Sequence, residues 1–111
     1  MILTADKAPA TIPEDVSLCL YRVIQESLRN IVKHSSAKKV TVKLESVDSR
    51  VHLAIADNGA GFDPAAPHRT GIGLLSMRER VRLIDGEIMV KSDHGQGTKI
   101  DVWAPLPKKK P

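Results

Sequence analysis

Three clusters of polar and glycine residues have types and spacings that suit chemistry. The first consists of Glu26, Asn30 and His34, which are four residues apart in a segment of helical periodicity and so share one side of a helix, with Lys33 beside them. Taken alone, this stripe is typical of a solvated helix face, because such residues are common on helices. The stripe therefore needs support from the other two clusters.

These two clusters are built on glycine. Asp57, Gly59 and Gly61 follow a strand-like segment, so a carboxylate could point into a cleft while backbone without a Cβ approaches a flat ligand. A plain turn is the alternative. The segment Gly71-Ile72-Gly73 begins a helix, whose free amides and positive dipole end favour a phosphate. A lone Gly-x-Gly is weak evidence, and this one lacks the remaining residues of the dinucleotide and Walker motifs.

Hydrophobic periodicity predicts the elements that must position these clusters. One helix is expected from residue 13 to about 34, and a second from 74 to about 85, closed by Gly86 at the usual C-terminal glycine position. Two hairpins are expected, with their four strands at 39–45, 51–56, 87–92 and 98–104. This order predicts an α/β (α+β) two-layer sandwich with helices on one face of a mostly antiparallel mixed sheet.

Length and composition bound the class of protein. The 111 residues suffice for one domain, which we place at 13–106, between an extended lead-in (1–12) and a basic tail (107–111). The net charge of +4 is spread along the chain, and only three residues are aromatic, which disfavours direct binding of nucleic acid. A single cysteine, Cys19, excludes an internal disulfide, and its helical apolar context predicts a buried side chain. No apolar run reaches the roughly 18 residues of a membrane span, so a cytoplasmic location is expected.

Taken in order, the clusters resemble the motifs of the GHKL (Bergerat-fold) ATPase superfamily. Residues 21–34 resemble its N box, Asp57-x-Gly59-x-Gly61 its adenine-binding box, residues 71–80 its second glycine box, and residues 95–98 its last motif. The Gly-x-Gly-Leu and Met-Arg-Glu-Arg elements are similar to those of sensor histidine kinases that partner LuxR/NarL-type response regulators. The resemblance covers residues 13–106, nearly the whole chain.

The resemblance implies a site for ATP and Mg²⁺. Asp57 would accept a hydrogen bond from the adenine amine, supported by Thr98, and would reject guanine, which carries an oxygen there. Asn30 would give Mg²⁺ an oxygen ligand. Glu26 would orient or deprotonate the nucleophile, or would act only by supporting its neighbours. The implied nucleotide contacts are Asn30, Lys33, His34, Asp57, Gly59, Gly61, Gly71, Ile72, Gly73, Leu74 and Thr98.

The resemblance also implies partners. A sensor kinase needs an acceptor histidine on a separate helical dimerisation domain, and none of the histidines here is placed to serve, His52 being expected to have a structural role. The 111-residue chain is therefore expected to be monomeric and unable to phosphorylate itself, its parent to be a homodimer, and a LuxR/NarL-type response regulator to act downstream. An anti-sigma-type serine kinase or hydrolytic relative, and a non-catalytic nucleotide-binding module, remain as alternatives.

Overall fold

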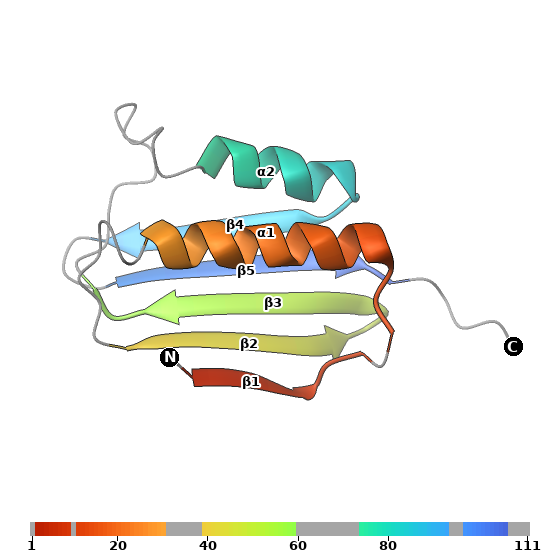
Figure 1. The fold of residues 1–111 in the computed structure, drawn as a ribbon, viewed down its shortest axis with the longest axis horizontal. Helices are drawn as coiled ribbons and strands as arrows, with labels where there is room; N and C mark the ends of the chain where they lie inside the picture. The colour runs from red at the N-terminus through yellow and green to blue at the C-terminus, as the bar shows by residue number, and fades with distance from the viewer. Residues whose placement is uncertain (1, 10, 31–38, 60–73, 94–96, 107–111) are drawn as a thin grey trace, which may run out of the picture.

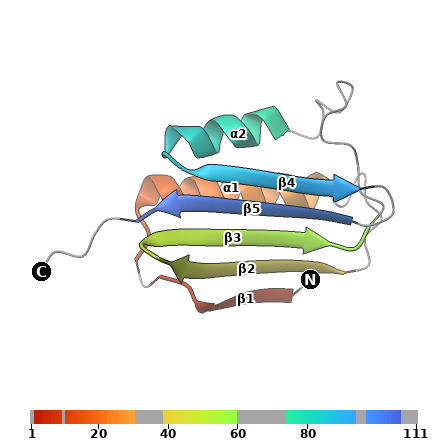
Figure 2. The same cartoon turned by 180° about the vertical axis from the view of Figure 1, so that it is seen from behind.

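Within the described part of the chain, seven elements of secondary structure form two layers, a five-stranded sheet and two helices on one of its faces (Figure 1). The computed structural model describes residues 2–9, 11–30, 39–59, 74–93 and 97–106. Turning the molecule by 180° brings the sheet in front of α1 (Figure 2), so the opposite face of the sheet carries no helix of the described residues. The predicted two-layer sandwich is confirmed. The elements are β1 (Ile2–Lys7), α1 (Glu14–Asn30), β2 (Val40–Val47), β3 (Arg50–Asp57), α2 (Leu74–Leu83), β4 (Glu87–Asp93) and β5 (Gly97–Pro105).

The strands follow the order β1-β2-β3-β5-β4. Only β1 and β2 are parallel, and the other three pairs are antiparallel, which confirms a mostly antiparallel mixed sheet. A two-residue turn joins β2 to β3, with φ values of 48° at Asp48 and 64° at Ser49. Two successive positive φ values are typical of the hairpin turn whose twist matches that of the strands.

Strand β1 was not predicted, because the sequence before residue 13 indicates only an extended lead-in. Residues 2–7 instead pair with β2, as in Leu3 with Val42. This edge strand binds a partner about 40 positions away and has no turn of its own, so no local pattern marks it. The division of the chain at residue 13 remains a prediction.

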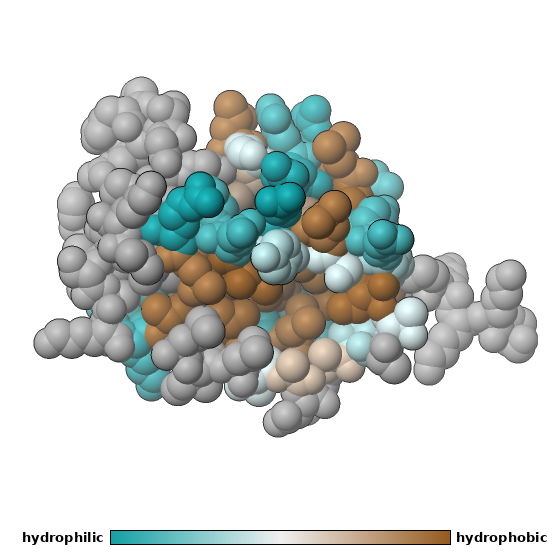
Figure 3. All heavy atoms as spheres, viewed as in Figure 1, coloured by the Kyte–Doolittle hydropathy of each residue, from teal (hydrophilic) through white to brown (hydrophobic). Residues whose placement is uncertain are grey.

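The core lies between the sheet and the inner faces of the helices. Helix α1 contributes Val16, Leu20 and Val23, which recur at helical spacing and are all less than 5% exposed. Cys19 is buried beside them, as predicted, and burial raises the pKa of its thiol. Figure 3 shows hydrophobic residues gathered beside α1, in the region between α1 and β1, whereas hydrophilic residues cover much of the outward surface of the helices. No helix of the described residues is long and apolar enough to cross a membrane.

The end of α2 differs from the predicted glycine stop. The helix ends at Leu83, and the amides of Asp85 and Gly86 donate to the carbonyls of Arg82 (3.0 Å) and Val81 (2.9 Å). In this Schellman arrangement the left-handed residue is Asp85, with φ 57°, not Gly86. Gly86 is needed for another reason: a Cβ there would lie 2.6 Å from the carbonyl oxygen of Trp103.

Replacing Asp85 by glycine should therefore stabilise the fold. The left-handed conformation is unfavourable by about 1 kcal/mol for a residue with a Cβ, and this steric penalty is absent in glycine. We expect the melting temperature to rise by about 4 °C. Asp85→Ala is the control, because it removes the same carboxylate but keeps the Cβ. An equal rise in both variants would show that charge, not backbone conformation, is responsible.

Candidate functional site

Four of the predicted site residues, Asn30, Asp57, Leu74 and Thr98, belong to element ends that lie at one end of the sheet. In both views of the ribbon, the end of α1, the end of β3, the start of β5 and the start of α2 lie at the same end of the molecule (Figures 1 and 2). Asn30 is the last residue of α1, Asp57 the last of β3, and Leu74 the first of α2. Thr98 is the second residue of β5. The topology therefore gathers residues from four elements that are far apart in sequence.

A row of polar residues crosses three strands at this end. The sheet registers Asp57 on β3 opposite Thr98 on β5, and Thr98 opposite Ser92 on β4. The two preceding rows on the same face are entirely apolar: Leu53, Val102 and Ile88, then Ile55, Ile100 and Val90. The core face thus changes from apolar to polar at the last row. Such a change inside a packed sheet face is what a binding site requires, because polar groups that point into it must find partners.

The carboxylate of Asp57 is held by the loop that follows it. Its Oδ1 accepts a hydrogen bond from the amide of buried Gly59 at 2.8 Å. Asn58 ties the same loop to the start of β2, since its Oδ1 accepts from the amide of Lys39 at 2.9 Å and its own amide donates to the Lys39 carbonyl at 3.2 Å. The backbone around Asp57 is therefore fixed before any ligand arrives.

Gly97 brings the start of β5 against the end of β3. It has a φ of +80°, and a Cβ at this position would overlap the carbonyl oxygen of Asp57. Both the conformation and the close approach exclude a side chain. Gly97 thereby sets the separation between Asp57 and Thr98. In the sequence this glycine is only part of the last motif, and no separate role is predicted for it.

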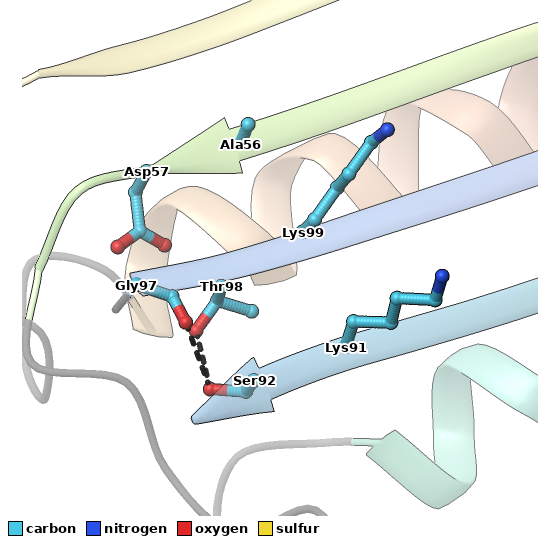
Figure 4. A pocket seen from close by; sticks show the side chains of 7 residues that line it. All are labelled: Ala56, Asp57, Lys91, Ser92, Gly97, Thr98 and Lys99. Atoms are coloured by element: carbon cyan, nitrogen blue, oxygen red, sulfur yellow. Dashed lines mark hydrogen bonds between the residues drawn. The ribbon is translucent and has the colours of Figure 1, made fainter. Parts of the chain in front are cut away.

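Ser92 is a site residue that sequence reasoning missed. Its Oγ lies 2.8 Å from the Oγ1 of Thr98 and donates to the carbonyl of Gly97 at 3.3 Å. Figure 4 shows these hydroxyls facing one another, with the Asp57 carboxylate pointing toward Gly97 and Thr98. The only sequence signal is a serine at the end of an otherwise apolar strand face, after Ile88 and Val90.

A hollow of about 260 Å³ opens at this end of the strands (Figure 4). Its lining includes residues from both faces of the sheet. Lys91 and Lys99 lie directly opposite each other in the register, and Lys99 also pairs with Asp101 at 3.9 Å. Two lysines face to face repel each other but make the rim attractive to an anion. The lining residues are Ala56, Asp57, Lys91, Ser92, Gly97, Thr98 and Lys99.

Helix α1 contributes Glu26 to this end of the molecule. The side chain of Glu26 is 27% exposed and forms a 3.8 Å ion pair with Arg29, one turn further along the helix. The neighbouring Ser27 is buried, and its Oγ lies 3.8 Å from the sulfur of Met77 on α2. Glu26 therefore sits on a segment that is packed firmly against the second helix.

Several predicted residues cannot be placed in the same way. Asn30 and Leu74 are located by their backbones alone. The remaining predicted contacts lie outside the described residues: Lys33, His34, Gly61, Gly71, Ile72 and Gly73.

His52 lies elsewhere, on the face of the sheet that α1 and α2 do not cover. Its Nε2 is 2.8 Å from the Oδ1 of Asp101, its Nδ1 is 3.3 Å from the Oε1 of Glu45, and its ring stacks on Trp103. The hydrogen bond to His52 holds the pKa of Glu45 below its ordinary value, with a smaller contribution from Lys43. These cross-strand contacts connect β2, β3 and β5, in keeping with the predicted structural role.

Comparisons with known proteins show the family and the fold of the chain. Residues 15–108 match the family described as "Histidine kinase-, DNA gyrase B-, and HSP90-like ATPase". The histidine kinase domain of the blue-light activated histidine kinase from Erythrobacter litoralis EL346 has the same fold, with a TM-score of 0.77 and 18% identity over 95% of this chain and 51% of that one.

Sequence relatives include sensor kinases. The histidine-protein kinase/phosphatase DegS of Brevibacillus brevis is 36% identical over 85% of this chain and 24% of its own length. UhpB of Salmonella typhimurium is 41% identical over 83% and 18%, and the sensor histidine kinase ComP of Bacillus subtilis 38% over 90% and 13%. The chain thus spans about a quarter or less of these relatives. With four motifs in order, a matching fold and a family match over most of its length, the chain belongs to the histidine kinase-, DNA gyrase B- and HSP90-like ATPase family.

Proposed function

We propose that this chain is the catalytic ATP-binding domain of a two-component sensor histidine kinase. Membership of an ATPase family implies nucleotide binding, and the relatives named as sensor kinases support the choice within that family. The observation that carries the proposal is the polar row of Asp57, Thr98 and Ser92 at the end of an apolar sheet face. The cytoplasm, where ATP is available, is the compartment that this function requires.

The polar row suits the adenine base. Asp57 offers a carboxylate oxygen to the exocyclic amine, and Thr98 supports that contact directly or through water. Gly59 and Gly61, which follow Asp57 in the sequence, would let the base come close to the backbone. Guanine carries an oxygen where adenine carries its amine, so Asp57 would repel it. The described residues fit an adenine base, because the hydrogen bond from the Gly59 amide already holds the Asp57 carboxylate in place.

The phosphates and the metal belong to the end of α1 and the start of α2. Mg²⁺, when bound, would neutralise phosphate charge, and the amide oxygen of Asn30 is the ligand we assign to it. Lys33 and His34 would meet the phosphates as donors. The amides of Gly71, Ile72 and Gly73, with Leu74, would cap them at the positive end of α2. The convergence of these two helix ends at the Asp57 end of the sheet supports the assignment.

The reaction is transfer of the γ-phosphoryl group to a histidine. A neutral imidazole nitrogen attacks phosphorus in line, the bond to the leaving ADP oxygen breaks, and the imidazole proton passes to a base. Glu26 is the carboxylate that we assign to orient or deprotonate that imidazole. The acceptor histidine would lie on the dimerisation domain of a homodimeric parent, and a LuxR/NarL-type response regulator would receive the phosphoryl group.

Titration calorimetry of the 111-residue chain tests the proposal. We expect ATP to bind at least about tenfold more tightly than GTP. The hydrogen bond from the adenine amine to Asp57 is replaced, with guanine, by two acceptors that face each other.

Asn30→Ala should weaken ATP binding when Mg²⁺ is present and leave it nearly unchanged in EDTA, since it removes a metal ligand.

The exposed Gln25, one to two turns before Asn30 on α1, provides the matched control. Gln25→Ala should bind ATP like the parent in both buffers. Equal affinity of the parent for ATP and GTP would refute the base assignment. An equal loss for Asn30→Ala in Mg²⁺ and in EDTA would show that Asn30 acts through helix packing.

A further inference from the structure

We infer that Ser92 is a positioning residue for base recognition, because it sets the direction in which the Thr98 hydroxyl donates. The inference rests on the proposed function, since it concerns the same nucleotide site. Ser92 belongs to none of the motifs that identify the family in this sequence. It enters the site only through the register of β4 with β5.

The geometry of three atoms carries the inference. Ser92 Oγ lies 3.3 Å from the Gly97 carbonyl oxygen and 2.8 Å from Thr98 Oγ1. A carbonyl oxygen can only accept, so the contact with Gly97 is a hydrogen bond only when Ser92 donates to it. The shorter contact then needs a proton from the other side, and Thr98 donates it to Ser92. Both contacts are hydrogen bonds only with this assignment.

The consequence is that Thr98 presents an acceptor to the site. Its proton is directed at Ser92, and its Oγ1 lone pairs are left for a donor in the hollow. Thr98 is only 9% exposed, so its hydroxyl has little water to compensate for a wrong orientation. Together with the carboxylate of Asp57, the row then consists of acceptors. Such a row selects a ligand edge, or a bridging water, that donates.

The direction in which the Thr98 hydroxyl donates depends, through Ser92, on the backbone of Gly97. The backbone there has a φ of +80° and lies so close to the carbonyl of Asp57 that a Cβ would overlap it, so the acceptor of the Ser92 hydroxyl belongs to a tightly packed junction of β3 and β5. Ser92 therefore transmits a backbone constraint from the β3–β5 junction to the Thr98 hydroxyl.

A double-mutant cycle read with two ligands tests the inference. The ligands are ATP and purine riboside triphosphate, which lacks the exocyclic amine, and the variants are Ser92→Ala, Thr98→Val and the pair. We expect Ser92→Ala to weaken ATP binding about three- to tenfold and binding of the analogue less. In the Thr98→Val background, Ser92→Ala should have little further effect. Ser92→Thr, which keeps the hydroxyl, should restore most of the ATP affinity.

Controls separate a positioning role from a packing role. Ser46→Ala, at an exposed position on β2, should match the parent. If Ser92→Ala unfolds, Ser92→Cys keeps the volume with a weak hydrogen-bonding group and should show the same pattern. An equal loss for both ligands, or a loss that persists in Thr98→Val, would overturn the inference. If the parent binds ATP and Asp57→Asn weakens it while Ser92→Ala does not, only this inference fails; absence of ATP binding by the parent would instead refute the proposed function.

Discussion

Replacing Asp57 by asparagine is expected to weaken ATP binding by about tenfold or more, although the side chain hardly changes in shape. One carboxylate oxygen already accepts from the buried Gly59 amide at 2.8 Å, and the adenine amine needs a second acceptor. Asparagine has one acceptor and one donor group. Whichever way its amide turns, it faces either Gly59 or the adenine amine with a donor, and an unpaired buried donor costs about 1–3 kcal/mol. Calorimetric titration with ATP measures the loss.

The same variant should also lose discrimination between purines. The asparagine amine can donate to the oxygen of guanine, so the preference for ATP over GTP should narrow. Asp48→Asn is the matched control, because Asp48 is exposed in the turn between β2 and β3, at the other end of β3 from Asp57, and its replacement removes the same charge. It should leave ATP affinity unchanged. Equal ATP affinity in Asp57→Asn and the parent would contradict the assignment of Asp57 to the base.

Local periodicity was enough to predict most of the fold. The alternation of Val51, Leu53 and Ile55 marks β3 and the face it buries, and the spacing of Val16, Leu20 and Val23 marks the inner side of α1. Both signals arise from burial against a single core, which selects residues at the period of the element. The candidate site was predicted differently, from glycines and polar residues whose order resembles a family.

The features that escaped prediction depend on strand register or on contacts with other elements of the fold. Ser92 becomes a site residue only when β4 is registered against β5, and a shift by one residue would turn it to the opposite face. Strand β1 forms because its backbone can pair with the edge of β2. Asp85 takes the left-handed position at the end of α2, while Gly86 is reserved for the close approach to Trp103, a contact with another strand. No local pattern contains this information.

The other large effect concerns phosphoryl transfer. Incubated with Mg²⁺ and ATP, the isolated chain should acquire no phosphohistidine, and with the dimerisation hairpin of its parent kinase as a separate piece, it should phosphorylate that piece on histidine. Glu26→Gln is expected to slow this transfer by about 100-fold, the contribution of a positioned base, while ATP affinity changes far less. Single-turnover transfer, followed as acid-labile phosphate on the hairpin, separates the chemical step from binding.

The ion pair between Glu26 and Arg29 supplies the control for this variant. Glu26→Gln also breaks that pair, but an ion pair at 3.8 Å with an Arg29 side chain 57% exposed contributes at most about 1 kcal/mol, too little for a 100-fold effect. Arg29→Gln breaks the same pair and keeps the carboxylate, so it should transfer phosphate nearly as fast as the parent. If both variants slowed phosphoryl transfer equally, the loss of the ion pair, and not the loss of the base, would explain the slower transfer. Acid-labile phosphate on the isolated chain would contradict the proposed division of roles, because the acceptor would then lie within these 111 residues.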